Sequence, residues 1–226
     1  MLPLASIMVV SYLVGAFPTS ILMAKLRRGI DIREHGSGNA GGTNVIRVLG
    51  LRAGLAVIGF DIFKGYVATM LVPNLMLGGL PFQNRTPFDD FTVIQIICGA
   101  TAVLGHIWTV FGGFRGGKGM ATASGMLLGL APIEVLVSFI IFWLVVLFSR
   151  YVSLGSLSAA VAFPLTMFFR ENIFHVDVDG YGTLIFFSIG IALLLIYTHR
   201  ANIKRLLEGT ENRLTNIRFS HRSREG

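Results

Sequence analysis

The chain has 226 residues, of which 53% are hydrophobic and only 14% are charged, and its formal net charge is +7. An ordinary water-soluble domain has roughly 25% charged residues, so this composition excludes one. The mean hydropathy of +0.70 indicates a protein embedded in lipid. The positive charge does not by itself indicate nucleic acid, because its meaning depends on where the basic residues lie relative to the apolar segments.

Six apolar runs approach the roughly 20 residues that a helix needs to cross a hydrocarbon core of ~30 Å. They span residues 4–26, 53–72, 91–111, 133–148, 154–169 and 183–198. No Lys or Arg precedes the first run, and it exceeds the apolar length of a signal peptide, so we interpret it as a retained helix. A seventh run, residues 120–130, is short and rich in Gly and Ala. Hydropathy leaves open whether this run crosses the membrane or enters and leaves it on the same side.

The distribution of charge favours a crossing. If the seventh run spans and the N-terminus lies outside, 16 of the 19 Lys and Arg residues fall on the inner side. The outer loops keep only Arg85 and Arg170 beside several acidic residues. The positive-inside rule therefore predicts about seven transmembrane helices, with the N-terminus outside and the C-terminus in the cytoplasm.

We thus expect an all-α integral membrane protein that forms a single domain over residues 1–226, with Gly-rich loops on the cytoplasmic side. The basic segment 200–226 is expected to be a cytoplasmic tail close to anionic lipid head groups. Nothing in the sequence indicates binding of nucleic acid.

The first polar segment on the inner side is SGNAGGTNVIR, residues 37–47. Glycine lets a backbone turn with positive φ and approach a ligand closely, and successive inward-pointing amides form an anion-binding nest. The polar side chains of the segment would complete such a site; they are Ser37, Asn39, Thr43, Asn44 and Arg47, between glycines 38, 41 and 42. The plainer alternative is a tight connector, but a connector needs only one or two glycines.

The second segment is GHIWTVFGGFRGGKGMATASG, residues 105–125. Residues 112–118 match the G-x-x-x-x-G-K part of a P-loop, but Gly119 stands where Ser or Thr would bind magnesium, and the strand-loop-helix context is missing. We therefore exclude an ATP site. We expect the amides of Gly116 and Gly117 and the ammonium of Lys118 to bind a phosphate group. A basic anchor at the membrane surface is the alternative.

Three further features lie near these loops. Segment 150–156, RYVSLGS, offers Ser153, although serine also caps helices. Asp61 and Lys64 are three residues apart on one helical face, and we interpret them as a supporting ion pair within the membrane. His106 and His199 each stand at the end of an apolar run. A structural role and a functional role stay open for both.

Together with FDIFKG (residues 60–65) and YTHRANIKRLLEGTE (residues 197–211), these segments resemble the bacterial acyl-phosphate:glycerol-3-phosphate acyltransferase family over nearly the whole chain. That family usually has proline where this chain has Ala40 and Thr109. The resemblance implies transfer of a fatty acyl group from acyl phosphate to the 1-hydroxyl of sn-glycerol 3-phosphate. The products are lysophosphatidate, for phospholipid synthesis, and inorganic phosphate. It also implies a multi-pass protein of the bacterial inner membrane, with its active site on the cytoplasmic face.

The resemblance also implies residue roles, with no cofactor and no metal. Acyl phosphate would be held by Ser37, Gly38, Asn39, Gly41, Thr43, Asn44, Gly116 and Gly117. Glycerol 3-phosphate would be held by Arg47, Lys118, Ser153, His199 and Asn202. Catalysis would involve Lys118, His106 and Ser153, supported by Asp61 and Lys64. The oligomeric state stays open.

The proton acceptor is a separate question. The His-to-Asp pairing of coenzyme A-dependent glycerolipid acyltransferases is absent, because the fifth residue after His106 is Phe111 and the fifth after His199 is Lys204. Either His106 or the substrate's own phosphate could accept the proton. We favour the phosphate, whose second pKa near ~6 makes it basic enough at neutral pH.

Two other classes of protein would use similar residues. A transporter for phosphorylated solutes would need matching broken helices in two halves and charges near the membrane midplane, and the sequence has no such repeat. A nucleotide-dependent phosphotransferase would need acidic metal ligands near the loops, where only Asp31, Glu34 and Asp61 lie.

Overall fold

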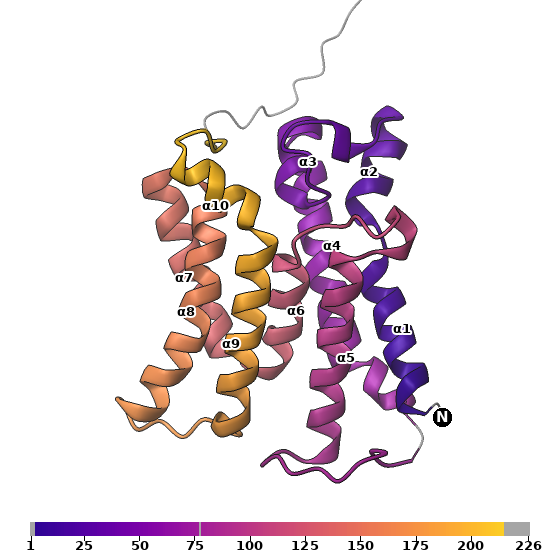
Figure 1. Ribbon diagram of the computed structural model, residues 1–226, viewed down its shortest axis with the longest axis vertical. Helices are drawn as coiled ribbons and strands as arrows, with labels where there is room; N and C mark the ends of the chain where they lie inside the picture. Colours follow the sequence, from indigo (N-terminus) through magenta and orange to yellow (C-terminus); the bar gives the residue numbers. More distant parts are fainter. Residues whose placement is uncertain (1–2, 77, 215–226) are drawn as a thin grey trace, which may run out of the picture.

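The structure is a computed structural model that describes residues 3–76 and 78–214, and its helices run along one long axis (Figure 1). In chain order the elements are α1 (Leu4–Ala16), α2 (Thr19–Arg28), the 3₁₀ turn η1 (Ile32–Glu34), α3 (Gly42–Leu49), α4 (Leu51–Met70), η2 (Val72–Leu75), α5 (Asp90–Ile107), η3 (Val110–Gly112), α6 (Met120–Leu130), α7 (Pro132–Ser149), α8 (Val152–Asn172), α9 (Tyr181–Thr198) and α10 (Arg200–Leu207). These described residues contain no strand, which confirms the all-α prediction.

Six segments are long and apolar enough to cross a membrane, and they match the six long runs of the sequence. They are Leu4–Arg28, Leu51–Met70, Asp90–Gly112, Pro132–Ser149, Val152–Asn172 and Tyr181–Thr198. The seventh run forms α6, which has 11 residues. At about 1.5 Å per residue it is about 16 Å long, roughly half of a hydrocarbon core. It begins part of the way down the bundle (Figure 1), so the loop before it enters the bundle.

The first predicted run is broken, which the sequence analysis did not anticipate. Phe17 and Pro18 separate α1 from α2, because proline lacks an N–H and disfavours helical conformation in the residue before it. The break removes the helical hydrogen bonds that the carbonyls of Ala16 and Phe17 would accept. Thr109 Oγ1 donates to the Ala16 carbonyl at 2.5 Å, and Lys64 Nζ donates to the Phe17 carbonyl at 3.0 Å. Backbone at membrane depth requires such replacements, since water is absent.

Glycine allows neighbouring helices to approach closely. Gly65 of α4 lies against the carbonyl of Thr122, and Gly125 of α6 lies against the carbonyl of Ile62. α1 and α5 meet in the same way at Gly15. In lipid no hydrophobic force drives helices together, so small residues that permit close backbone packing stabilise the contact.

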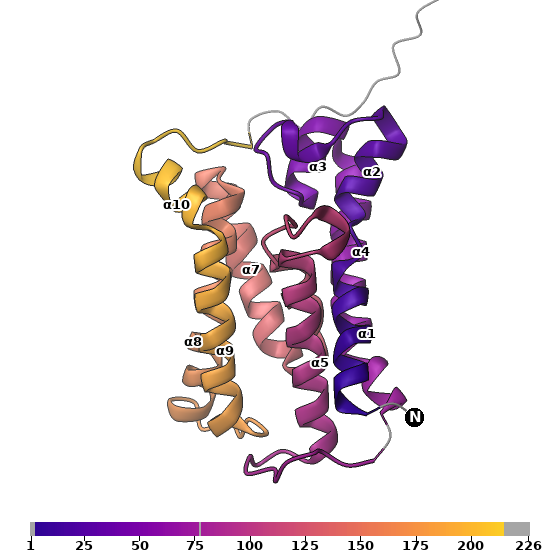
Figure 2. The same ribbon diagram turned by 45° about the vertical axis from the view of Figure 1, so that its right-hand side comes forward.

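The two ends of the chain lie at opposite ends of the bundle. Figures 1 and 2 show the start of α1 at one end and α3, α10 and the end of α2 at the other. The number of membrane crossings stays a prediction from hydropathy and charge. Residues 215–226 of the expected tail lie outside the described residues. The side of the membrane that each end faces stays a prediction from charge.

That prediction can be tested by cysteine labelling. With Cys98 replaced by alanine, we expect a cysteine at the exposed position Gln83 to react with an impermeant maleimide from outside the inner membrane. A cysteine at the exposed position Thr210 should react only after the membrane is permeabilised. The reverse pattern would contradict the predicted orientation.

Candidate active site

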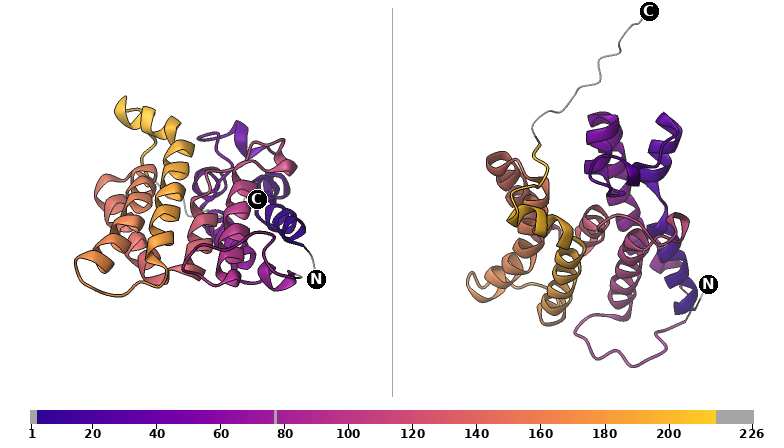
Figure 3. Two further views of the ribbon diagram at one scale, coloured as in Figure 1. Left: turned by 60° about the horizontal axis from the view of Figure 1, so that its bottom comes forward. Right: turned by 45° about the horizontal axis from the view of Figure 1, so that its top comes forward.

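A polar cavity of about 110 Å³ is lined by the start of α3 and by Asn202 of α10. Figure 3 shows the end of the bundle at which these two helices lie. Residues far apart in the sequence meet there. Of the residues selected from the sequence, its lining contains Ser37, Asn39, Gly41, Thr43, Asn44, Arg47, Asp61, His106, Lys118, Ser153, His199 and Asn202. Lys64, Gly116 and Gly117 line a smaller adjacent pocket of about 10 Å³. Gly38 lines neither pocket and occupies a turn with φ +71°.

Four helices begin at the larger cavity. Its lining includes the first residues of α3, α6 and α8, and His199, which precedes α10. The first amides of a helix have no acceptor within the helix, and the aligned peptide dipoles give that end a partial positive charge. No backbone or side-chain atom in the described part of the chain accepts from the amides of Gly42, Thr43 or Ala121. These helix N-termini make the cavity a favourable site for an anion.

Asn44 holds the α2–α3 loop together. Its Nδ2 lies within hydrogen-bond distance of the carbonyls of Ile32 (3.0 Å), His35 (2.8 Å) and Asn39 (3.1 Å). Its Oδ1 accepts from the amide of Ser37 at 2.8 Å. The side chain is buried and has no donor left for a ligand. We had expected Asn44 to contact acyl phosphate, and that role stays a prediction; in this structure its side chain shapes the α2–α3 loop.

The α5–α6 loop also differs from the expected amide nest. The amide of Gly116 donates to the carbonyl of Ile107 at 3.0 Å, and that of Gly117 donates to the carbonyl of His106 at 3.1 Å. Both amides therefore tie the loop to the end of α5 in this structure, and their expected role in binding phosphate stays a prediction. Their lack of a side chain matters instead, because a Cβ at Gly117 would collide with the His106 ring. The cation of this loop, Lys118, does face the cavity.

Lys118 begins a chain of polar contacts that ends at a buried acid. Its ammonium donates to Asn202 Oδ1, and Asn202 Nδ2 donates to Glu211 Oε1 at 3.0 Å. Glu211 Oε2 accepts from Arg205 Nε at 2.8 Å. Because an ionised carboxylate only accepts, Glu211 fixes which end of the Asn202 amide faces Lys118. Glu211 is a lining residue that the sequence analysis missed. A signal was available in the sequence, because Glu211 is an acidic residue within the basic segment 200–226 and such a residue is expected to pair with a cation.

Burial changes the protonation of the two ionisable groups beside this chain. It lowers the pKa of Lys118 to about 8, with Arg205 and Arg47 acting in the same direction and Glu211 opposing them. It also lowers the pKa of His199 to about 4, assisted by the nearby Lys118 charge. His199 is therefore neutral at physiological pH. Its Nδ1 lies 2.7 Å from the Leu195 carbonyl, so Nδ1 carries the proton and Nε2 is an acceptor.

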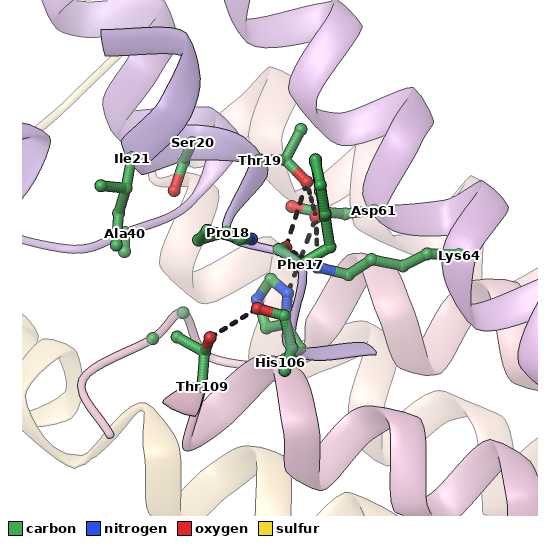
Figure 4. Close-up of a pocket in the computed structure, with 13 residues that line it drawn as sticks. Phe17, Pro18, Thr19, Ser20, Ile21, Ala40, Asp61, Lys64, His106 and Thr109 are labelled. Carbon is green, nitrogen blue, oxygen red and sulfur yellow. Dashed lines mark hydrogen bonds and ion pairs between the residues drawn. The ribbon is translucent and has the colours of Figure 1, made fainter. Parts of the chain in front are cut away.

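Asp61 and Lys64 form a buried ion pair of 2.8 Å at the smaller pocket (Figure 4), and Asp61 also lines the larger cavity. Asp61 Oδ1 also accepts from Thr19 Oγ1 at 3.1 Å, and His106 Nδ1 lies 3.7 Å from it. Since Lys64 donates to the Phe17 carbonyl, the pair fastens α4 to the break between α1 and α2. It also holds an acid next to His106, a juxtaposition that the sequence spacing did not reveal.

Ser153 is the one cavity side chain whose buried polar atom lacks a partner among the described residues. Its Oγ lies in the second residue of α8, where a hydroxyl has no helical carbonyl to bond. A buried hydroxyl without a hydrogen bond is costly, so a ligand atom in the cavity would relieve that cost. This observation supports Ser153 as a ligand contact. Ser156 is instead satisfied by the Val152 carbonyl at 3.0 Å.

Comparison with known proteins identifies the family. Residues 5–209 match the family model described as glycerol-3-phosphate acyltransferase. The chain belongs to the glycerol-3-phosphate acyltransferase family.

Relatives named glycerol-3-phosphate acyltransferase match over nearly the full length of this chain. The one from Chlorobaculum tepidum is 49% identical, over 95% of this chain and 98% of its own length. The one from Chlorobaculum parvum is 47% identical, over 99% and 100%. Crystal structures of PlsY (YgiH), an integral membrane glycerol 3-phosphate acyltransferase, are similar in fold. The glycerol 3-phosphate form has a TM-score of 0.76 at 35% identity, covering 93% of this chain and 94% of that one. The lysophosphatidic acid form has a TM-score of 0.74 at 34% identity.

The family resemblance inferred from the sequence motifs is thus confirmed, and so are the all-helical membrane fold and the enzyme class. The roles of individual residues stay predictions. In the described residues, no group of three or more His, Cys, Asp or Glu side chains is arranged to hold a metal ion. Beyond Glu211, the lining residues to which the sequence analysis gave no role are mostly apolar or glycine: Gly42, Ile58, Gly119, Met120, Ala121, Val152 and the hydroxyl-bearing Ser156.

The role given to Asn44 leads to a stability prediction. Asn44→Ala should lower the free energy of unfolding by about 2 to 3 kcal/mol, because it leaves buried backbone groups of the loop unpaired. The readout is the thermal unfolding midpoint of the purified enzyme in detergent. Asn39→Ala is the matched control, since the side chain of Asn39 lines the cavity and makes no internal bond in the described residues. Equal midpoints for the two variants would contradict the prediction.

Proposed function

We propose that this enzyme transfers a fatty acyl group from acyl phosphate to the 1-hydroxyl of sn-glycerol 3-phosphate, forming lysophosphatidate and inorganic phosphate. The reaction would take place at the cytoplasmic face of a bacterial inner membrane, in one domain that comprises the whole chain. The observation that carries the proposal is the meeting of four helix starts with Lys118 and Arg47 in one cavity of a lipid-embedded bundle. Both substrates present phosphate, and the donor's acyl chain can remain in lipid.

The α2–α3 side of the cavity suits acyl phosphate. The free amides of Gly42 and Thr43 stand at the start of α3, with Ser37 and Asn39 beside them. Fixed amide donors and a helix dipole stabilise the negative charge that develops on the departing phosphate, and they need no reorganisation during the reaction. Gly38 and Gly41 supply the turns that bring this backbone to the cavity.

The opposite side suits glycerol 3-phosphate. Lys118 and Arg47 can pair with its phosphate, and Asn202 and Ser153 offer further hydrogen bonds. The unprotonated Nε2 of His199 can accept a hydrogen bond from a substrate hydroxyl. Binding of this kind would orient the 1-hydroxyl towards the acyl carbon, and orientation alone supplies a large part of the acceleration in acyl transfer.

The reaction requires little acid-base chemistry from the protein. The 1-hydroxyl oxygen forms a bond to the acyl carbon, and the bond from that carbon to the phosphate oxygen breaks. The hydroxyl proton ends on the released phosphate, so protons balance without a net exchange with solvent. We favour direct acceptance of the proton by a substrate phosphate. His106 is the alternative acceptor, held beside Asp61 at the same cavity.

The pKa of Lys118 leads to a prediction about pH. The ammonium is charged below its pKa of about 8 and neutral above it, so the KM for glycerol 3-phosphate should rise as pH increases through 8. Lys118→Arg, whose guanidinium stays charged throughout this pH range, should remove that inflection. Lys118→Ala should insert normally and lose activity by on the order of a hundredfold, because substrate positioning fails. Nearly unchanged turnover of Lys118→Ala would leave only a surface-anchor role for this lysine.

The nature of the donor can be tested directly. The inner-side loops are short and glycine-rich, which suits a phosphate, because a phosphate needs only amides and a few cations. We expect the purified enzyme to use a long-chain acyl phosphate with stoichiometric release of inorganic phosphate. The same acyl chain on coenzyme A should give a far lower kcat/KM. Comparable kcat/KM for the thioester would exclude the proposed donor.

A further inference from the structure

We propose that Arg33, held in place by Asp31, is a positioning residue that sets the α5–α6 loop so that Lys118 can bind glycerol 3-phosphate. This inference rests on the proposed function and adds a residue that neither lines the cavity nor belongs to the roles set out above.

Asp31 and Arg33 form a two-pronged ion pair within the α2–α3 loop. Arg33 Nη2 lies 2.7 Å from Asp31 Oδ2, and Arg33 Nε lies 3.0 Å from Oδ1. Asp31 Oδ1 also accepts from the Arg33 amide at 2.9 Å, which starts the turn η1. Hydrogen bonds from Arg33 hold the pKa of Asp31 at about 2, so the pair is charged throughout the physiological range. The guanidinium is therefore fixed in direction before it contacts anything else.

The remaining nitrogen of Arg33 reaches the α5–α6 loop. Nη1 donates to the carbonyl of Gly112 at 2.6 Å and, more weakly, to that of Arg115 at 3.4 Å. These two carbonyls lie on either side of Gly113 and Phe114, which both have positive φ, +61° and +58°. A left-handed conformation is unfavourable for phenylalanine, so this turn needs contacts from elsewhere to persist. Arg33 supplies one across the turn.

The effect of Arg33 is transmitted through the loop, because Arg33 lines neither the cavity nor the smaller pocket. The loop from Gly112 to Lys118 is fastened at three places. Arg33 holds its start, the amides of Gly116 and Gly117 bond to the end of α5, and Thr198 Oγ1 donates to the Lys118 carbonyl at 2.9 Å. Without the first fastening, the turn can relax towards right-handed conformations and displace the backbone that carries Lys118.

The test is a double-mutant cycle on the full-length enzyme in detergent. The dissociation constant of glycerol 3-phosphate is measured by calorimetric titration for wild type, Arg33→Gln, Lys118→Ala and the double variant. We expect Arg33→Gln to weaken binding about tenfold, and to do so by less than about twofold when Lys118 is already alanine, because residues that act through one another are not additive. In turnover assays Arg33→Gln should raise the KM for glycerol 3-phosphate more than it changes kcat, and leave the KM for acyl phosphate unchanged.

Arg28→Gln is the matched control, since it removes the same charge from an exposed position at the end of α2 on the same side of the bundle. Its affinity should stay within about twofold of wild type, which excludes a general loss of electrostatic attraction. Asp31→Asn keeps the Arg33 charge but weakens its anchor, and it should weaken binding in the same direction by a smaller factor. It also carries the test if Arg33→Gln does not insert.

Equal weakening by Arg33→Gln in the wild-type and Lys118→Ala backgrounds would overturn the inference, as would wild-type affinity in Asp31→Asn. Failure of the proposed function would look different: the wild-type enzyme itself would neither bind nor acylate glycerol 3-phosphate.

Discussion

The site depends on one constraint, which is that a helix cannot begin inside a lipid-embedded protein without leaving amides unpaired. α3, α6 and α8 each begin at the cavity, and α10 begins beside it. Their free N–H groups and helix dipoles favour negative charge at the cavity. The half-length α6 and the short α3 add two helix starts to the one that the longer α8 supplies, so that several helix N-termini meet at one cavity.

Interrupted helices also expose carbonyls, and the structure satisfies these with side chains from neighbouring helices. Lys64 reaches the Phe17 carbonyl at the break between α1 and α2, and Thr109 reaches the Ala16 carbonyl. Thr109 stands where the family usually has proline, so this hydrogen bond is one that a proline could not make. Asp61 neutralises Lys64 and lies beside His106. The polar network next to the cavity thus stabilises the breaks on which the cavity depends.

The sequence predicted the fold class and most of the cavity lining, because glycine density, polar side chains and basic residues gather in a few segments. It could not predict which amides face the cavity. The amides of Gly116 and Gly117 donate to carbonyls of α5, and the Asn44 side-chain amide donates to carbonyls of its own loop. These partners depend on the path of the folded chain, which the sequence pattern does not reveal. Glu211 and Arg33 were missed for a related reason. Glu211 orients the Asn202 amide, and Arg33 bonds to a turn far away in the sequence. Neither contact produces a recognisable motif in the local sequence.

A buried acid in an anion-binding cavity needs a physical reason. Lys118, Arg47 and Arg205 repel one another when the cavity is empty, and burial further disfavours the charge on Lys118. Glu211 offsets that repulsion and, through Asn202, keeps an acceptor on the Lys118 ammonium. A phosphate dianion would then replace Asn202 as the partner of Lys118 and favour its charged form. In the proposed function, removing the carboxylate would therefore weaken phosphate binding although it removes a negative charge, because it leaves Lys118 less protonated and Asn202 free to turn.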